Sequence, residues 1–260
     1  MVPVVVVVLI AAGCGRFGFG DTQATGDGGV DGTVPIDAPP CTPSGHDEDD
    51  DGTDDACDVC PQVPGTQLDS DGDGVGDGCD PSSSAHARRL FDPFVSLRPE
   101  WMFSPGATIT GDALRYASIN QGSGATLAIT PGRDVYELAG RLLAGGPIAG
   151  GHQVSLQLDA GATTFYCELH EDGGGFALKY TVYDGTLYDN IAMEPLPGPF
   201  TMGPFILRMI HDPPDVVCQG EFGGVPVAVQ GPASGVPVEH YVTVFNIDVE
   251  LDYYQHLEIR

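Results

Sequence analysis

Two acidic loops of the same pattern, which begin 22 residues apart, constrain this chain more than any other feature. The first begins at Asp47 and the second at Asp69, and each has Asp at positions 1, 3, 5, 9 and 12 and Gly at position 6. Carboxylates at this spacing can surround one hard cation with oxygen, and Ca²⁺ takes roughly six to eight oxygen ligands. The repeated pattern therefore predicts a calcium-binding segment that holds about two or more ions.

The predicted ligands are the acidic side chains of both loops together with the backbone carbonyl at position 7. They are Asp47, Asp49, Asp51, Thr53, Asp55 and Asp58 in the first loop, and Asp69, Asp71, Asp73, Val75, Asp77 and Asp80 in the second. Gly at position 6 permits the sharp turn that directs the early ligands inward. Because so many neighbouring carboxylates repel one another and few apolar residues accompany them, we expect the segment to be disordered without metal.

An ordinary EF-hand is not expected here. Pro, Gly, Cys and Ser flank the loops, where an EF-hand has amphipathic helices. Position 12 is also Asp in both loops, rather than the longer Glu that binds Ca²⁺ with both oxygens. We therefore expect a calcium dissociation constant of about 10⁻⁴–10⁻³ M, the range of extracellular modules.

The cysteines indicate an oxidising compartment. Cys14 stands apart near the N-terminus, and the six that remain are an even number, which suits disulfide bonding. Several connectivities are possible, and proximity in the sequence favours the pairs Cys41–Cys57, Cys60–Cys79 and Cys167–Cys218. An intracellular zinc site is the alternative, since Cys57-x-x-Cys60 has ligand spacing, but the Asp-rich surroundings argue against it.

The loops and cysteines together resemble the thrombospondin type 3 repeat. The resemblance covers about residues 41–81 and rests on Cys60-Pro61, Gln67 and the stretch from Asp69 to Asp80. It implies Asp-rich loops that disulfides staple around a line of calcium ions. The sequence departs from the family where Val63-Pro64-Gly65 replaces the usual Asn-Pro, and it contains only two repeats. We therefore expect a short, calcium-stiffened segment rather than a long array.

The N-terminus predicts export and a lipid anchor. An apolar run from Val4 to Ile10 is too short to span a bilayer as a helix but fits the core of a signal peptide. Ala11-Ala12-Gly13 before Cys14 resembles the bacterial lipobox, which implies lipidation of Cys14. A buried strand is the alternative, although the Gly-, Asp- and Thr-rich residues 15–40 could not pack against it. We interpret residues 1–14 as a signal peptide with lipobox and residues 15–40 as a flexible tether.

The charge of the chain excludes one class of partner. The net charge is −27, and residues 15–85 alone hold seventeen acidic residues and one basic residue. No nucleic acid is expected as a partner, because little in such a chain neutralises phosphate. Calcium ions and a glycan or other cell-surface ligand are the expected partners, and membrane contact is expected through the lipid anchor only.

From Leu90 onward the composition predicts an all-β domain. Residues 82–89 are interpreted as a linker, and residues 90–260 contain short alternating apolar runs between Gly, Pro and Asp turns. Runs over 164–169 and 176–183 read as a hairpin. The residues from Asp134 to Leu143 fit a helix or a strand. Cys167 and Cys218 would join neighbouring strands or two sheets.

The order of these runs resembles the concanavalin-like jelly roll of lectins, laminin G modules and several glycosidase families. Trp101-x-Phe103 near the start and the aromatic-rich run from Leu251 to Ile259 at the end carry this resemblance. It implies an all-β, concanavalin-like jelly-roll β-sandwich, preceded by the irregular calcium-binding repeats. A fold-level likeness says little about function by itself.

The search for a catalytic site yields weak candidates. Asp248, Glu250 and Asp252 would share one face of the last strand, and we interpret them as a solvated face rather than a catalytic set. The run from His170 to Asp172 reads as a loop. Aromatic residues that could stack on sugars are Trp101, Tyr180, Tyr183, Tyr188, Tyr253 and Tyr254. An enzyme is therefore not the favoured reading.

The sequence thus predicts a surface-anchored, calcium-binding lipoprotein. Its repeats would form a rigid stalk that presents a lectin-like sandwich for adhesion or carbohydrate binding. Gly15 and Arg16 follow Cys14, with no Asp to indicate retention at the inner membrane, so the outer membrane or cell surface is expected. The alternatives are a secreted carbohydrate-active hydrolase on the same fold and a purely structural envelope protein.

Overall fold

The computed structural model describes residues 41–65, 67–81, 86–118, 121–129, 132–145, 151–171, 175–196 and 202–260. All of these residues belong to one compact unit. The expected signal peptide, Cys14 and the tether over 15–40 lie outside the described residues. Within the described part of the chain, no helix is long and apolar enough to cross a membrane.

The described residues beyond the repeats form fifteen strands. They are β1 (His86–Asp92), β2 (Trp101–Phe103), β3 (Thr108–Thr110), β4 (Ala113–Ala117), β5 (Gly122–Ala128), β6 (Asp134–Gly145), β7 (His152–Asp159), β8 (Thr164–Glu171), β9 (Phe176–Tyr183), β10 (Tyr188–Pro195), β11 (Pro204–Asp212), β12 (Asp215–Phe222), β13 (Val225–Pro232), β14 (Glu239–Phe245) and β15 (Ile247–Ile259).

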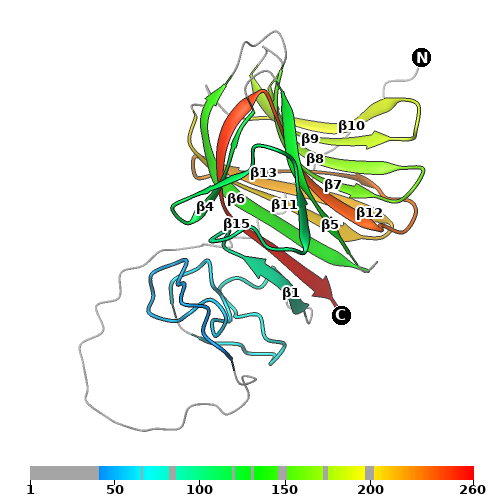
Figure 1. The fold of residues 1–260 in the computed structure, drawn as a ribbon. Coiled ribbons are helices and arrows are strands. Elements are labelled where there is room, and N and C mark those ends of the chain that lie inside the picture. Colours follow the sequence, from blue (N-terminus) through cyan, green and yellow to red (C-terminus); the bar gives the residue numbers. More distant parts are fainter. Residues whose placement is uncertain are drawn as a thin grey trace, which may run out of the picture. The chain divides into compact units, whose positions relative to one another are not determined.

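These strands make two antiparallel sheets, which confirms the predicted all-β sandwich. The first sheet has the order β13-β12-β11-β6-β15-β4-β3, and β1 also pairs with β15. The second has the order β10-β9-β8-β7-β14-β5-β2. Figure 1 shows β10, β9, β8 and β7 side by side in this second sheet. The predicted hairpin is β8 paired with β9.

Alternation along β8 shows why the sequence folds this way. Phe165, Cys167 and Leu169 are buried on one face, whereas Tyr166 and His170 on the opposite face are half-buried and Glu168 beside them is 7% exposed. Successive side chains of a strand point to opposite faces, so one face meets the core and the other remains accessible. Cys167 is joined to Cys218 of β12, which belongs to the other sheet. This disulfide therefore links the two sheets rather than neighbouring strands.

Residues 41–81 have no strand or helix in their described part and are held by turns and disulfides. Cys41 is joined to Cys57, with 5.1 Å between the Cα atoms, and Cys60 is joined to Cys79, with 5.6 Å. Both pairs are those that sequence proximity favours. The two disulfides thus give the loops part of the stability that a hydrophobic core gives the sandwich.

The structure decides one assignment that the sequence left open, and it differs from two others. The stretch from Asp134 to Leu143 is strand throughout, because β6 lies between β11 and β15 and takes ladder hydrogen bonds on both sides. His170 and Glu171 belong to β8 rather than to a loop, because both continue the pairing with β7. Strand β1 begins at His86, inside the expected linker, because residues 86–88 pair with the last residues of β15.

Candidate functional site

The two acidic loops have the same local geometry. In each loop the backbone N–H at position 6 donates to the position 1 carboxylate, over 2.8 Å from Gly52 to Asp47 and 2.9 Å from Gly74 to Asp69. The N–H at position 7 donates to the position 5 carboxylate, over 2.8 Å in both loops. Such bonds between side chain and backbone replace the ladders of regular structure.

Glycine at position 6 is required by the backbone. Gly52 has a φ of 94° and Gly74 a φ of 91°, a left-handed conformation that residues with a Cβ rarely adopt. At position 9, the carboxylates of Asp55 and Asp77 each accept the N–H of position 2 over 2.8 Å. The sequence repeat is therefore also a structural repeat, down to individual hydrogen bonds.

The first three carboxylates of each loop converge. Possible ligand oxygens of Asp47, Asp49 and Asp51 all lie within 4.8 Å of one another, and those of Asp69, Asp71 and Asp73 do the same. Oδ1 of Asp47 and Oδ2 of Asp49 are buried without a hydrogen-bond partner among the described residues. A buried carboxylate oxygen without a donor is costly, and a bound cation would satisfy it. The donor set therefore fits a hard cation such as Ca²⁺.

The carboxylates also disfavour one another as anions. Burial, together with the charges of Asp51, Asp58 and Asp47, raises the pKa of Asp49 to about 6. Burial and the neighbouring Asp73 likewise raise the pKa of Asp71. A divalent cation between these groups would remove the repulsion, because an opposite charge favours the ionised form.

The two position 12 residues have different surroundings. Oδ1 of Asp58 accepts the N–H of Cys60 over 2.6 Å, and its Oδ2 is buried without a hydrogen-bond partner among the described residues. Asp80 instead lies beside His86 of β1, with 2.9 Å between a carboxylate oxygen and Nδ1 of the imidazole. The second loop thus contacts the first strand of the sandwich.

The repeats contact the sandwich at several points, so they are not a free stalk. Val75 packs with Val135 of β6 and Leu257 of β15. The amide of Gln62 donates to Gln255 over 2.7 Å. The guanidinium of Arg88 donates over 2.7 Å to the backbone carbonyl of Asp58. Such polar and apolar contacts tie the repeats to strands β1, β6 and β15 of the first sheet.

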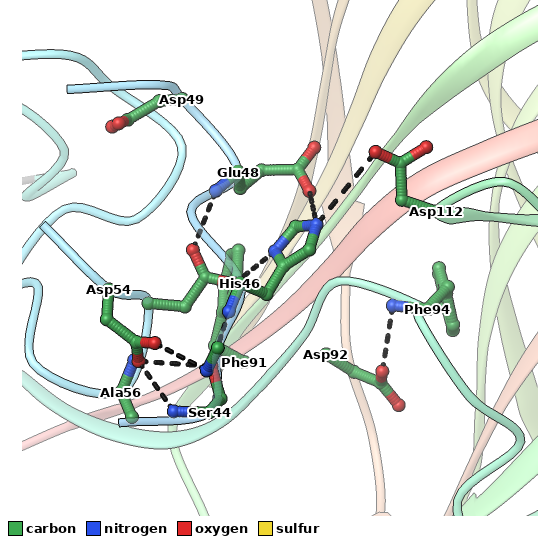
Figure 2. Close-up of polar contacts among 12 residues, drawn as sticks. Ser44, His46, Glu48, Asp49, Asp54, Ala56, Phe91, Asp92, Phe94 and Asp112 are labelled. Atoms are coloured by element: carbon green, nitrogen blue, oxygen red, sulfur yellow. Dashed lines mark hydrogen bonds and ion pairs between the residues drawn. The ribbon is translucent and has the colours of Figure 1, made fainter. Parts of the chain in front are cut away.

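A histidine of the first repeat lies among acidic groups of both regions. Nδ1 of His46 lies 2.7 Å from Asp55, and Nε2 lies 4.0 Å from both Glu48 and Asp112. Figure 2 shows the His46 ring between Glu48 and Asp112, which belongs to the turn between β3 and β4. Burial and the nearby charges of Asp252, Asp55 and Asp112 raise the pKa of Glu48 to about 8.

A cleft of about 950 Å³ lies on the outer face of the second sheet. Its floor is made by outward side chains that the strand register places opposite one another. Gln157 of β7 lies between Tyr166 of β8 and Tyr241 of β14. In the next row Glu168 and Thr243 line the cleft on either side of Ser155, which is itself fully buried. Both rows combine aromatic or carboxylate groups with amides and hydroxyls, the groups that recognise polar ligands.

Hydrogen bonds fix several of these side chains. The hydroxyl of Thr181 donates to Glu168 over 2.6 Å, and Ser155 and Thr243 share a hydrogen bond of 2.6 Å. His170 lies 3.8 Å from Glu168. At one edge of the cleft Tyr188 is 67% exposed and stacks on Tyr183, with ring centroids 4.5 Å apart. The cleft is therefore a pre-organised surface with an accessible aromatic ring.

The six aromatic residues proposed to stack on sugars differ in whether they lie at the cleft or in the core. Tyr188 lines the cleft, and Tyr183, its partner on β9, stacks on its ring. The other four are buried in or beside the core: Trp101, Tyr180, Tyr253 and Tyr254. Trp101 donates to Asp92 over 3.0 Å, and Tyr253 donates to Glu137 over 2.8 Å, so their polar atoms are used internally.

The three acids of β15 lie on the other sheet, away from the cleft. Asp248 is 2.8 Å and Glu250 is 3.9 Å from the guanidinium of Arg115. Asp252 is close enough to Glu48 of the first repeat to raise its pKa. These contacts place Asp248 and Glu250 beside Arg115, and Asp252 at the junction with the repeats.

Sequence reasoning missed most of the cleft. Tyr166, Glu168 and Lys179 line it, and none of them was a candidate. The signal was the polar half of each alternating strand, for example Tyr166-x-Glu168-x-His170 between buried apolar residues. The strand order, however, decides which of these polar residues become neighbours on one sheet.

Comparisons with known proteins show the fold and no family. No protein-family model matches the chain, and no curated protein matches it in sequence. Among solved structures, the CBM2 module of the evolved Dit of Lactobacillus casei BL23 phage J-1 is similar with a TM-score of 0.55 and 10% identity, over 67% of this chain and 96% of that one.

Two further structures agree. A beta-glucanase of Bacillus licheniformis has a TM-score of 0.50 and 9% identity, over 66% of this chain and 98% of that one. The exoplasmic/lumenal domain of VIP36, in a Ca²⁺- and Man3GlcNAc-bound form, has a TM-score of 0.50 and 8% identity, over 66% and 88%. The chain spans only 39% of the GH43 protein BlXynB of Bacillus licheniformis. The sandwich therefore has the predicted concanavalin-like jelly-roll fold, shared with lectins and glycoside hydrolases.

Proposed function

We propose that this chain is an exported calcium-binding protein whose sandwich binds a glycan in the cleft of the second sheet. The observation that carries the glycan assignment is the cleft itself. It combines an exposed aromatic ring, Tyr188, with the amide of Gln157 and the carboxylate of Glu168. Aromatic faces stack on apolar sugar faces, while amides and carboxylates hydrogen-bond to hydroxyls.

The fold supports this assignment as an analogy. Similar structures include the exoplasmic/lumenal domain of VIP36 in a Ca²⁺- and Man3GlcNAc-bound form, and a beta-glucanase. Their identity to this chain is 8–9%, so they argue for the fold and not for a ligand. The geometry of the cleft on this chain carries the rest.

Calcium is proposed for both acidic loops. The support is the convergence of three carboxylates in each loop, the left-handed glycine at position 6 and the buried carboxylate oxygens of Asp47 and Asp49 without donors. The loops are proposed to form a thrombospondin type 3-like segment over residues 41–81. Its contacts with the sandwich make it a base for that domain rather than a detached spacer.

Export is supported by the three disulfides, which persist in oxidising compartments. Lipidation of Cys14 and a place at the outer membrane or cell surface are proposed from the sequence alone. Residues 1–14 remain a proposed signal peptide with lipobox, followed by a tether over 15–40. Mass spectrometry of the mature N-terminus tests this part. A mature chain that lacks lipid or begins at another residue contradicts the anchor.

The glycan assignment is tested with a glycan array and two matched amide variants. Gln157→Ala changes the cleft floor, whereas Gln219→Ala changes an amide on the outer face of the other sheet. We expect Gln157→Ala and Tyr188→Ala each to weaken binding by roughly 10-fold or more, since stacking or a lost hydrogen bond costs about 1–3 kcal/mol. Equal binding by wild type and Tyr188→Ala would refute the cleft as the site.

A hydrolase is the second candidate, and Glu168 is the observation that favours it. It is 7% exposed, faces the cleft and lies beside His170 and Thr181. Among the described residues that line the cleft it is the sole carboxylate, whereas retaining glycosidases use two carboxyls about 5–5.5 Å apart. Release of reducing sugar by wild type that Glu168→Gln abolishes would establish the enzyme and displace the binding assignment.

A further inference from the structure

His86 occupies an unusual place at the junction of the two regions. It is the first residue of β1, and its side chain is 1% exposed. Its backbone N–H donates to the carboxylate of Asp73, and its Nδ1 lies 2.9 Å from a carboxylate oxygen of Asp80. One acid of the second loop therefore meets the buried imidazole of His86, and another accepts a hydrogen bond from its backbone N–H.

The imidazole nitrogen is aimed into this cluster. Although Nδ1 of His86 is close to Asp80, it makes no hydrogen bond of normal geometry to any described residue. Burying a ring nitrogen without a hydrogen bond costs free energy. A proton or a metal ion between Nδ1 of His86 and the carboxylate oxygen of Asp80 would remove that cost. Possible ligand atoms of Asp73, Asp80 and His86 all lie within 4.8 Å of one another.

The donor set differs from that of the two acidic loops. Ca²⁺ prefers oxygen ligands, whereas imidazole suits Zn²⁺ and similar transition metals. Zn²⁺ binds His nitrogen and carboxylate oxygen at about 2.0–2.2 Å, so neighbouring ligand atoms around it are roughly 3–3.5 Å apart. The 2.9 Å between His86 and Asp80 needs only a small adjustment to reach that spacing.

We propose that Asp73, Asp80 and His86 form a mixed nitrogen–oxygen metal site for Zn²⁺ or a similar divalent cation, beside the proposed calcium site of the second loop. Asp73 and Asp80 belong to both donor sets, so these two carboxylates would be shared between the calcium of the second loop and this metal, and His86 is the ligand that only the mixed site uses. The site joins a ligand of the sandwich to two ligands of the repeat. Its metal would clamp the repeat onto β1.

Two variants separate this site from the proposed calcium loop. His86→Gln removes the nitrogen ligand and leaves every loop ligand in place. Asp71→Asn changes a carboxylate of the second loop that is absent from the mixed cluster. Zn²⁺ and Ca²⁺ are titrated separately by calorimetry into the full mature chain, and Zn²⁺ is also titrated into the calcium-saturated protein.

We expect a double dissociation. His86→Gln should weaken Zn²⁺ binding by at least about 10-fold and leave Ca²⁺ binding unchanged, whereas Asp71→Asn should weaken Ca²⁺ binding and spare Zn²⁺. Equal Zn²⁺ affinity in wild type and His86→Gln overturns the proposal. So does a loss of both ions in Asp71→Asn, which would mean one shared site. Failure of Ca²⁺ binding alone would contradict the calcium loops and not this site.

A direct measurement covers the case in which His86→Gln fails to fold. Crystals of the wild-type protein are soaked in Zn²⁺ with Ca²⁺ present, and anomalous scattering is measured at the zinc edge. A peak at about 2.0–2.2 Å from Nδ1 of His86 supports the site. A peak elsewhere, or none at His86, overturns it.

Discussion

In the sandwich, side chains such as Leu156, Leu178 and Leu207 are fully buried between two sheets, and many others share that core. In the described residues of 41–81, Cys60 and Val75 are the buried hydrophobic residues. The repeats hold their loops with carboxylate–backbone hydrogen bonds and two disulfides instead. One region is thus stabilised by apolar burial, whereas the other brings together carboxylates that repel one another and that the proposed cation would neutralise.

Removal of calcium should produce the largest difference between the two regions. Where no metal site pre-exists in the unfolded chain, the binding free energy of the metal contributes to folding. We expect a chelator to expose residues 41–81 to protease while the sandwich stays folded. Limited proteolysis with mass spectrometry of the fragments measures this.

Two results would contradict the predicted difference between the repeats and the sandwich. Cleavage of residues 41–81 that is indifferent to chelator would contradict the calcium assignment. Loss of the sandwich together with the repeats would mean that the contacts of Val75 and Gln62 make one cooperative unit. Circular dichroism of the chelated protein distinguishes these cases.

Loss of the inter-sheet disulfide should be the next largest effect. Cys167 and Cys218 are both fully buried and join β8 to β12 across the core. Replacing both by Ala should lower the free energy of unfolding of the sandwich by about 2–5 kcal/mol. The control is Cys60 and Cys79 replaced by Ala, which should weaken calcium binding and leave the sandwich transition in place. Denaturant unfolding followed by Trp101 fluorescence reports the sandwich.

The core also contains a pH-sensitive group, His240 of β14. It is fully buried and stacks on Tyr136, with ring centroids 4.5 Å apart. Tyr254 and His256 also lie beside these rings, and His256 contacts Asp134 at 2.9 Å. Burial, with a smaller contribution from the charge of His256, lowers the pKa of His240 to about 3.

The sign of the pH effect follows from that lowered pKa. The unfolded chain binds a proton at His240 below about pH 6.5, whereas the folded chain does not until about pH 3. The stability that His240 contributes is therefore present above about pH 6.5 and lost as the pH falls toward 3, by at most about 1.4 kcal/mol per pH unit. His240→Phe should flatten the pH dependence of the unfolding free energy over this window. An identical slope in the variant would contradict the assignment.

The smallest effect separates two neighbouring residues of the first loop. Asp51→Asn removes a charged ligand at position 5 and should weaken calcium binding on the order of 10-fold. Asp50→Asn makes the same change at position 4, which is not a ligand position, and Asn tolerates its left-handed φ of 59°. Calorimetry of both variants measures the difference. Equal affinities would show that net charge, and not coordination, governs the loop.

Ser70 shows where sequence spacing was an incomplete guide. Position 2 of the loop is not a ligand position, so the spacing alone predicts that substitution of Ser70 has little effect. In the structure the Ser70 hydroxyl donates to Asp77 over 2.6 Å, and this bond lowers the pKa of that carboxyl. Ser70 therefore orients a position 9 carboxylate, which is a contact that spacing alone does not reveal.

Interactions between residues that are close in the sequence determined much of this protein's structure. The loop pattern with glycine at position 6, the cysteine pairs at short separation and the alternation that produces an all-β sandwich all depend on residues near one another in the chain. Hydrogen bonds such as those of Gly52 and Gly74 are made within a few residues, so spacing is sufficient to predict them.

Tertiary structure alone decided which side chains meet. Tyr166, Gln157 and Tyr241 form one row because β14, β7 and β8 are neighbours in the sheet, although β14 lies far from both in sequence. Gln62 of the repeats meets Gln255 of β15 although the two residues are 193 positions apart in the chain. Strand order across a sheet is set by the burial of whole faces, which no short stretch of sequence specifies.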